Sequence, residues 1–525
     1  MSKAAEMAKV SVKGGFHIFW GLVASTIISA VGTILVARLL APSEYGLYAI
    51  ALVAPNLIQN FRDWGVNVAM IKYSAQYNSE NQTAKVKSIL VSGLFFETVL
   101  GLSLSVLSLL LSDFLATTAF QRPTITPLIQ IASFSILTGA FLNSAQAAFT
   151  GIEKMQLNSI TLIVQSTIKT ILIPSLVILG LGTFGAVIGY TISFLIAGLT
   201  GLLLMWIMYK SLPKHTVAKL EISANIKTMF KYGLPLSIAT ILGGFLVQFY
   251  NFLLAIYATD VMIGNYTVAT NFVVLVTFFA TPVTIMMFPA FSKLDPEKDQ
   301  QTLRRFFQFS VKYASLLVVP SAAIVMALSQ PGVSTLFGVE YGAAPLFLSL
   351  LAITYLYSAF GNLSTVNLIN GQGQTVFNMK LTLLTAAIGF PLGFILISQL
   401  GVLGLITTSL TAGIPSLILS LRWIKQNYNV TVDWISSAKI LLSSAIAATI
   451  TYALTSQLRF NSWITLIIGI VVFLPVFIVA ILLTRALDRF DINNLREMLS
   501  TLGPLSGLIN YLLNIVEKIM NILRL

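Results

Sequence analysis

The sequence contains no cysteine, and only two of its 525 residues are histidine. Without cysteine the chain has no disulfide, no thiolate nucleophile and no cysteine-ligated metal, and its redox compartment cannot be inferred. The two histidines, His17 and His215, are expected near helix ends rather than close together. We therefore predict neither a metal site nor a cofactor.

Charge is also scarce. Charged residues make up 9% of the chain and hydrophobic residues 56%, with a mean hydropathy of +0.88. A soluble domain is typically about 25% charged. Apolar runs of roughly 18 or more residues recur from end to end, and such runs are long enough to cross a bilayer. The chain is therefore predicted to be an all-α polytopic membrane protein.

The net charge of +13 does not indicate a nucleic-acid partner. The basic residues are spread over short loops, and an anionic membrane surface attracts such loops.

Lysine and arginine also predict the orientation of the chain in the membrane, because they concentrate in cytoplasmic loops. The predicted external ends and loops hold only Arg38, Arg122 and Arg459. We expect both termini to be cytoplasmic, with the N-terminal segment starting the first helix rather than forming a removable signal.

Turn and charge breaks divide the apolar runs into about fourteen predicted membrane-spanning helices. They cover 15–40, 45–70, 88–112, 124–149, 157–180, 184–209, 231–258, 262–290, 305–328, 342–368, 378–399, 402–424, 436–457 and 462–485.

Two weak internal repeats connect the halves of the chain. ILVARLLAPSEYGLYAIA, at 34–51, recurs 218 positions later, so that Gly264 and Tyr266 stand where Gly46 and Tyr48 stood. GIEKMQLN, at 151–158, is matched by GQGQTVFN at 371–378, and a Gly-rich turn follows each copy in the same order. Same-orientation copies predict two parallel six-helix repeats related by an axis along the membrane normal.

The repeats predict four regions. The N-lobe is 1–210, with helices 1–6, and the C-lobe is 211–425, with helices 7–12. Two extra helices occupy 426–487. The tail, 488–525, is predicted to form two short amphipathic helices split by Gly503-Pro504 and to lie in the cytoplasmic interface. A fifteenth span within the tail is the alternative.

Three motifs resemble one family of membrane proteins. They are ARLLAPSEYGLYAIA, then Asp63-Trp64-Gly65 followed by AMIKY at 69–73, and finally GQGQTVFN. In this order they resemble the Wzx-type oligosaccharide flippases, the polysaccharide-biosynthesis membrane proteins of the MOP (multidrug/oligosaccharidyl-lipid/polysaccharide) superfamily. The resemblance covers the whole chain, and lipid II flippases are a second similar group.

The resemblance implies a function. Such a protein moves a polyprenyl-linked oligosaccharide from the cytoplasmic to the outer leaflet, through a central cavity that opens alternately to each side. It implies surface polysaccharide or glycoprotein assembly in a prokaryotic cell membrane, no covalent chemistry and hence no enzyme. Expected partners are the lipid-linked oligosaccharide, membrane lipids and a coupling ion, H⁺ or Na⁺, with the chain acting as a monomer.

An ion-coupled multidrug or metabolite antiporter of the same superfamily is the alternative. It would need an acidic residue in the middle of helix 1 or helix 7. The sequence has none between Phe16 and Val36, and none in helix 7 before Asp260. The sequence therefore favours the flippase.

Two charges are predicted near mid-membrane, Glu97 on helix 3 and Lys169 on helix 5. Because a buried charge is costly, such residues are candidates for function. Lys169 would bind phosphate, with Glu97 as its counter-ion or as a proton-coupling site. A structural ion pair between two helices, or a lysine that reaches the interface, is an equal alternative.

The other candidates are interfacial or uncharged. Arg38 is either a phosphate site at the exit or an interfacial arginine, whereas Arg62 and Asp63 more simply form a local charge pair. No catalytic residue is predicted. Uncharged side chains inside predicted helices either contact sugar in the cavity or join helices to one another. These are Asn143, Gln146, Gln165, Gln248, Asn251, Asn271, Asn362 and Asn367.

Overall fold

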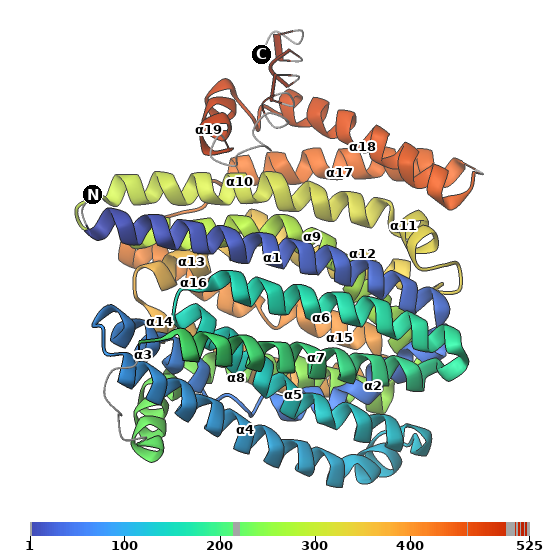
Figure 1. Cartoon of the computed structure of the whole chain (residues 1–525). Helices are drawn as coiled ribbons and strands as arrows, with labels where there is room; N and C mark the ends of the chain where they lie inside the picture. The colour runs from blue at the N-terminus through green and yellow to red at the C-terminus, as the bar shows by residue number, and fades with distance from the viewer. Residues whose placement is uncertain are drawn as a thin grey trace. The chain divides into compact units, whose positions relative to one another are not determined.

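A computed structural model describes residues 3–213, 221–458 and 460–499, with eight further positions between 510 and 521. The regular structure in these residues is helical, without a strand, so the predicted all-α class is confirmed (Figure 1). The helices form two compact units. Unit 1 consists of 1–267 and 386–405, and unit 2 of 268–385 and 406–525.

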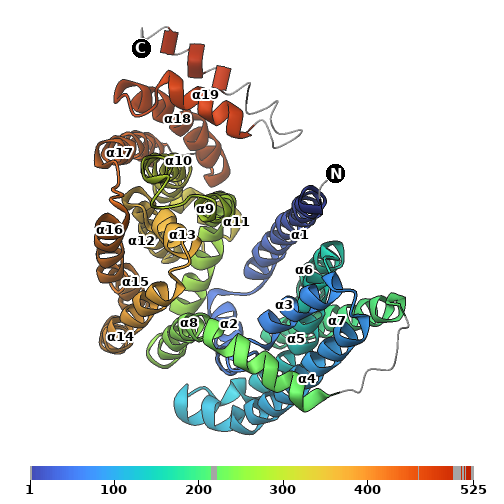
Figure 2. The same ribbon diagram turned by 90° about the vertical axis from the view of Figure 1, so that its left-hand side faces the viewer.

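Unit 1 is a bundle of long helices. Figure 2 looks along several of them, with α4 and α5 packed together and α7 against α5. The helix α1 packs against α6, which in turn packs against α7. Small and apolar side chains fill the core, including Met70, Phe149 and Met229. Its complete helices are α1 (Lys3–Leu39), α2 (Pro42–Gln59), α3 (Val66–Ser79), α4 (Thr83–Phe114), η1 (Leu115–Ala119), η2 (Pro123–Ile125), α5 (Thr126–Gly151), α6 (Met155–Leu176), η3 (Val177–Leu181), α7 (Gly182–Ser211) and α8 (Ile222–Tyr257).

Three helices have residues in both units: α9 (Asp260–Ser292), α14 (Thr375–Leu400) and α15 (Val402–Thr411). Within unit 2, α10 packs against α12 and α17, and α17 packs against α18. Phe291, Phe307 and Leu368 contribute to its core. The complete helices of unit 2 are α10 (Gln300–Ala327), α11 (Ser329–Leu336), α12 (Ala344–Leu356), η4 (Tyr357–Phe360), α13 (Asn362–Gly371), α16 (Ile414–Tyr428), α17 (Trp434–Gln457), α18 (Ser462–Leu483) and α19 (Arg489–Leu499).

Every predicted span coincides with a helix or with helices in series. Among the described residues, ten helical segments are long and apolar enough to cross a membrane, and an eleventh is obtained if the bent pair 344–360 and 362–371 counts as one span. The chain is thus a multi-pass membrane protein, whereas the count of fourteen and the lobe boundaries stay predictions.

The second predicted span, 45–70, is broken into α2 and α3. Trp64 and Gly65 both have left-handed backbone conformations, with φ of 48° and 85°. The break also allows a close approach, because a Cβ atom added to Gly65 would lie 2.2 Å from the carbonyl oxygen of Gly233. Glycine is the residue that tolerates both conditions. The motif Asp63-Trp64-Gly65 therefore redirects the chain within a span.

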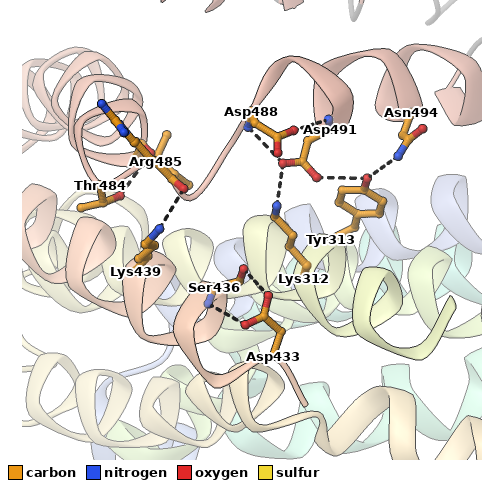
Figure 3. Close-up of polar contacts among 11 residues, drawn as sticks. Lys312, Tyr313, Asp433, Ser436, Lys439, Thr484, Arg485, Asp488, Asp491 and Asn494 are labelled. Atoms are coloured by element: carbon orange, nitrogen blue, oxygen red, sulfur yellow. Dashed lines mark hydrogen bonds and ion pairs between the residues drawn. The ribbon is translucent and has the colours of Figure 1, made fainter. Parts of the chain in front are cut away.

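The C-terminal helix α19 is anchored to α10 (Figure 3). Asp488 and Asp491 cap the helix reciprocally, because each carboxylate accepts a hydrogen bond from the other residue's backbone N–H. Asp491, 1% exposed, also accepts a 2.6 Å hydrogen bond from Lys312. The predicted break at Gly503-Pro504 lies outside the described residues, and the interfacial position of the tail stays a prediction.

Candidate functional site

A buried ion pair lies inside unit 1, next to the α2–α3 break. The Nε atom of Arg62 donates to Oε2 of Glu97 on α4 at 2.9 Å. The side chains of these two residues are 5% and 0% exposed, respectively. Oε1 of Glu97 accepts a second hydrogen bond, from Nδ2 of Asn67 at 2.9 Å. The break thus brings one donor from each side of the turn to a single carboxylate.

Further hydrogen bonds hold this cluster. Arg62 Nη1 donates to the carbonyl oxygen of Ile136 on α5, and Asp63 accepts from the backbone N–H of Asn67 at 2.8 Å. The sequence suggested Lys169 as the partner of Glu97, and Asp63 as that of Arg62. The structure differs on both points, because the carboxylate and guanidinium pair with each other. An ion pair out of water is tolerable when further hydrogen bonds support it, and here Asn67 and the Ile136 carbonyl oxygen supply two of them.

Lys169 on α6 has an aromatic environment instead. Its Nζ lies 5.8 Å from the ring centroid of Tyr190 on α7, close enough for a cation–π attraction. The Tyr190 ring packs on Tyr48 and on Phe194, with centroids 6.5 and 5.0 Å away. Among the residues described, Lys169 forms no ion pair with a carboxylate. In the part of the chain that the structure describes, the ring of Tyr190 is thus the contact that stabilises this charge.

A single glycine separates the two charged groups. A Cβ atom added to Gly139 on α5 would lie 3.0 Å from Nη1 of Arg62 and 3.7 Å from Cδ1 of Phe194. The aromatic side chains beside Lys169, those of Tyr190 and Phe194, therefore extend to the Arg62–Glu97 ion pair at Gly139. Together they form a cation–aromatic cluster of Lys169, Tyr190, Phe194, Arg62 and Glu97.

The two repeat-related turns contact each other symmetrically. A Cβ atom on Gly46, in α2, would lie 1.9 Å from the carbonyl oxygen of Asp260. A Cβ atom on Gly264, in α9, would lie 2.0 Å from the carbonyl oxygen of Pro42. The 218-position offset of the repeat, which matches Gly46 with Gly264, also matches Pro42 with Asp260. Each glycine therefore lies against the carbonyl oxygen of the equivalent residue in the other copy of the repeat. Two equivalent contacts of this kind are the pattern of a two-fold axis. We call these four residues the glycine seam.

Arg122 reinforces the seam from the α4–α5 connection. Its Nε atom donates to Oδ1 of Asp260 at 2.5 Å. Its Nη atoms donate to the carbonyl oxygens of Ala255 and Ala258, at 2.6 and 2.8 Å, at the end of α8. The last carbonyls of a helix lack partners within the helix, and a basic side chain is a suitable donor. Arg122 therefore both caps α8 and holds the first residue of α9.

The uncharged candidates are distributed over both units. Within unit 1, Gln146 donates to Thr161 and so joins α5 to α6, while Asn251 donates to Gln248 on the same helix. Three candidates belong to unit 2, where Asn271 is half-buried, Asn362 is exposed and Asn367 donates to the carbonyl oxygen of Leu363. Of the other uncharged candidates in unit 1, Asn143 is exposed and Gln165 half-buried, and the charged candidate Arg38 is also exposed.

Sequence reasoning did not identify Asn67 or the role of Arg122. Asn67 stands four residues after Asp63, which is the spacing of one helical turn, but nothing in that spacing indicates Glu97 as a partner. Arg122 counted only as an external arginine. Its contacts join segments more than 130 positions apart, as the bonds to Ala255 and Asp260 show.

Buried charges within long apolar helices, together with two repeat-related turns in contact, are features of a polytopic membrane transporter. The chain belongs to the Polysaccharide biosynthesis protein family, whose model matches residues 11–295.

Three similar proteins agree with this class. The probable low-salt glycan biosynthesis flippase Agl15 of Haloferax volcanii is 22% identical over 277 residues, 52% of this chain and 57% of that protein. The inward closed structure of the lipid II flippase MurJ aligns with a TM-score of 0.71 at 17% identity, over 88% of this chain and 97% of MurJ. An inward-facing multidrug resistance MATE transporter of the MOP superfamily gives 0.62 at 16% identity, over 77% and 94%. The two structures share the fold, and all three proteins are flippases or transporters rather than enzymes.

Proposed function

We propose that the protein is a flippase that moves a polyprenyl-linked oligosaccharide from the cytoplasmic to the outer leaflet by alternating access. The family and the flippase Agl15 support a role in polysaccharide or glycan assembly. The head group of such a lipid carries phosphate and sugar, and both must cross the hydrocarbon layer. That requires a cation for the phosphate and polar or aromatic surfaces for the sugar.

The proposal rests on the environment of the Lys169 ammonium group. Its ammonium group lies on a span without a carboxylate partner among the described residues, and the nearest acid of the cluster, Glu97, is already paired with Arg62. An unpaired charge inside a membrane is costly. An anion that binds beside the ammonium group of Lys169 would therefore be stabilised. We therefore assign phosphate binding to Lys169, with Tyr190 as the adjoining aromatic surface. Arg62 and Glu97 hold the α2–α3 break in place.

The glycine seam and Arg122 join α2, α8 and α9 at one end of unit 1. With both termini in the cytoplasm, as the distribution of lysine and arginine predicts, this end is external. We propose that the seam separates when the protein opens to the outside. The setting we propose is the cell membrane of a prokaryote, with the chain acting as a monomer and H⁺ or Na⁺ as the driving ion. The polar residues not placed in this cluster stay candidates for sugar contacts.

An ion-coupled antiporter of drugs or metabolites is the second candidate, favoured by the shared MATE fold. Such a protein requires a carboxylate that can gain and lose an ion within its cavity. Two acidic side chains of unit 1 are already engaged, because Glu97 is held by Arg62 and Asn67, and Asp260 by Arg122.

The test is transbilayer movement of a short-chain polyprenyl-diphosphate oligosaccharide in reconstituted vesicles. An impermeant glycosidase removes sugar that reaches its side, with or without a pH or sodium gradient. Movement above that in protein-free vesicles supports the flippase, and dependence on one gradient identifies the driving ion. No movement, together with uptake of a cationic dye under the same gradients, would reject the flippase in favour of the antiporter.

Two variants test the role of Lys169 in the same vesicles. Lys169→Gln should reduce movement by about tenfold or more, since it removes the charge that binds phosphate, whereas Lys169→Arg should retain most of it. Lys210→Gln is the matched control, because Lys210 also lies over an aromatic ring, 3.6 Å from the centroid of Trp206, but is exposed at the end of α7. Unchanged movement in Lys169→Gln would reject the phosphate site.

A further inference from the structure

A second cation-rich site lies between α3 and α8, both in unit 1. A cavity of about 540 Å³ is lined by Tyr73 from α3 and by Lys227, Thr228, Lys231 and Tyr232 from α8. It shares no lining residue with the cation–aromatic cluster. The two tyrosine rings meet edge to face, with centroids 5.8 Å apart, and so form two walls at a steep angle to each other.

The ammonium group of Lys72 lies against both tyrosine rings that line this cavity. Nζ of Lys72 lies 3.7 Å from the ring centroid of Tyr232 and 4.8 Å from that of Tyr73. Aromatic faces attract cations, so the walls hold this charge in place. Lys227 and Lys231 are spaced by four residues and project from one face of α8, where like charges repel.

These charges are not compensated by acidic side chains. None of the three lysines takes part in an ion pair in the part of the chain that the structure describes. A bound anion would remove the repulsion between Lys227 and Lys231. Lysine is a good partner for phosphate, and both lysines belong to the same lining.

We propose that this cavity, which we call the lysine–tyrosine pocket, binds the phosphate group of a lipid at the cytoplasmic surface of the membrane. The ammonium groups of Lys227 and Lys231 bind the phosphate oxygens, with the charge of Lys72 nearby, and the tyrosine rings pack against the adjoining part of the head group. Two lipids carry this chemistry, the diphosphate of the transported lipid and the phosphate of an anionic phospholipid. The first source rests on the proposed flippase function, and it would make the pocket a loading site at which substrate waits before entering the bundle.

The experiment measures lipid binding to the purified, delipidated full-length chain by native mass spectrometry. Two ligands are titrated separately, a short-chain polyprenyl diphosphate and phosphatidylglycerol. The test variant is Lys227→Gln/Lys231→Gln, in which both residues are exposed, so folding should be retained and is checked by thermal unfolding. Lys210→Gln is the control for loss of an exposed lysine near an aromatic ring.

We expect the double variant to bind at least one of these lipids roughly tenfold more weakly, with Lys210→Gln unchanged. A loss for the diphosphate alone assigns the pocket to substrate, a loss for phosphatidylglycerol alone assigns it to membrane lipid, and an equal loss shows a phosphate site open to both. Unchanged binding of both lipids, or an equal loss in the control, would overturn the proposal. Failure of the vesicle assay with the wild-type chain would reject the flippase without affecting this binding result.

Discussion

Replacement of Gly46 by alanine should open the glycine seam. The added methyl group would lie 1.9 Å from the carbonyl oxygen of Asp260, whereas ordinary contact begins at 3.4 Å. The two backbones must therefore separate by the difference, about 1.5 Å, or bend. Overpacking of this kind costs about 1–3 kcal/mol. Because only the closed seam has this contact, the equilibrium between closed and open seam should shift toward the open form by about 5- to 150-fold.

The absence of cysteine gives a clean assay. Ala255 is 1% exposed in the closed seam, so a single Ala255→Cys reporter should react with a water-soluble maleimide only when the seam opens. The reaction is followed in detergent, where the orientation of the protein does not matter. If opening is faster than labelling, the labelling rate should rise with the open population, by about 5- to 150-fold in Gly46→Ala.

Two further variants make the assay decisive. Gly264→Ala should have the same effect as Gly46→Ala, because its methyl group would lie 2.0 Å from the carbonyl oxygen of Pro42. Gly243→Ala is the control, since a Cβ atom there meets nothing within 4 Å and the substitution is also within a helix. Equal labelling in Gly46→Ala and Gly243→Ala would show that the seam is not a closing contact. An effect at Gly46 but not at Gly264 would refute the symmetry.

Three other predictions concern stability. Glu97→Gln should lower the free energy of unfolding by about 3–5 kcal/mol, since it leaves Arg62 buried without its counter-charge, and a thermal unfolding curve as stable as the wild type would contradict this. Burial acts to raise the pKa of Asp433, but hydrogen bonds from the first turn of α17 lower it below its ordinary 3.8. Its contribution is therefore present above about pH 4 and is lost as the pH falls further, so Asp433→Ala should lose about 1 kcal/mol near neutral pH and progressively less below about pH 4. Asp491→Asn should release α19 from Lys312, which limited proteolysis would detect as faster cleavage after α18, whereas an unchanged pattern would argue against the anchor.

The helices were predictable from the sequence because long apolar runs leave few other structures in a membrane. The break between α2 and α3 was not, since Pro55, the residue type that most disfavours a helix interior, lies inside α2, while the chain turns at Trp64 and Gly65. That turn is stabilised by hydrogen bonds to Glu97 and by the close approach to Gly233. Both are tertiary interactions, and local patterns do not specify them.

The candidate site was predictable in its residue types but not in its pairing. The cost of a charge in mid-membrane identified Glu97 and Lys169 as unusual. Which cation faces Glu97 depends on the rotation of α4 relative to its neighbours, and a turn of one residue changes the direction of a side chain by about 100°. The repeat likewise matched Gly46 with Gly264, but only the structure shows that each meets the other's turn.

The two glycine contacts of the seam are related by the repeat, whereas the contacts of Arg122 are not, and this difference has consequences for how the seam opens. The two glycine contacts are equivalent, so they should form and break together, but Arg122 has no counterpart, because the corresponding positions 340–342 hold Glu-Tyr-Gly. The bias toward closure should therefore depend on one arginine. Arg122→Gln removes the ion pair to Asp260 and the caps on α8, and should raise labelling of the Ala255→Cys reporter about tenfold or more. Glu340→Gln, at the equivalent exposed position, should leave it unchanged. Equal labelling in both variants would mean that the glycine contacts alone hold the seam closed.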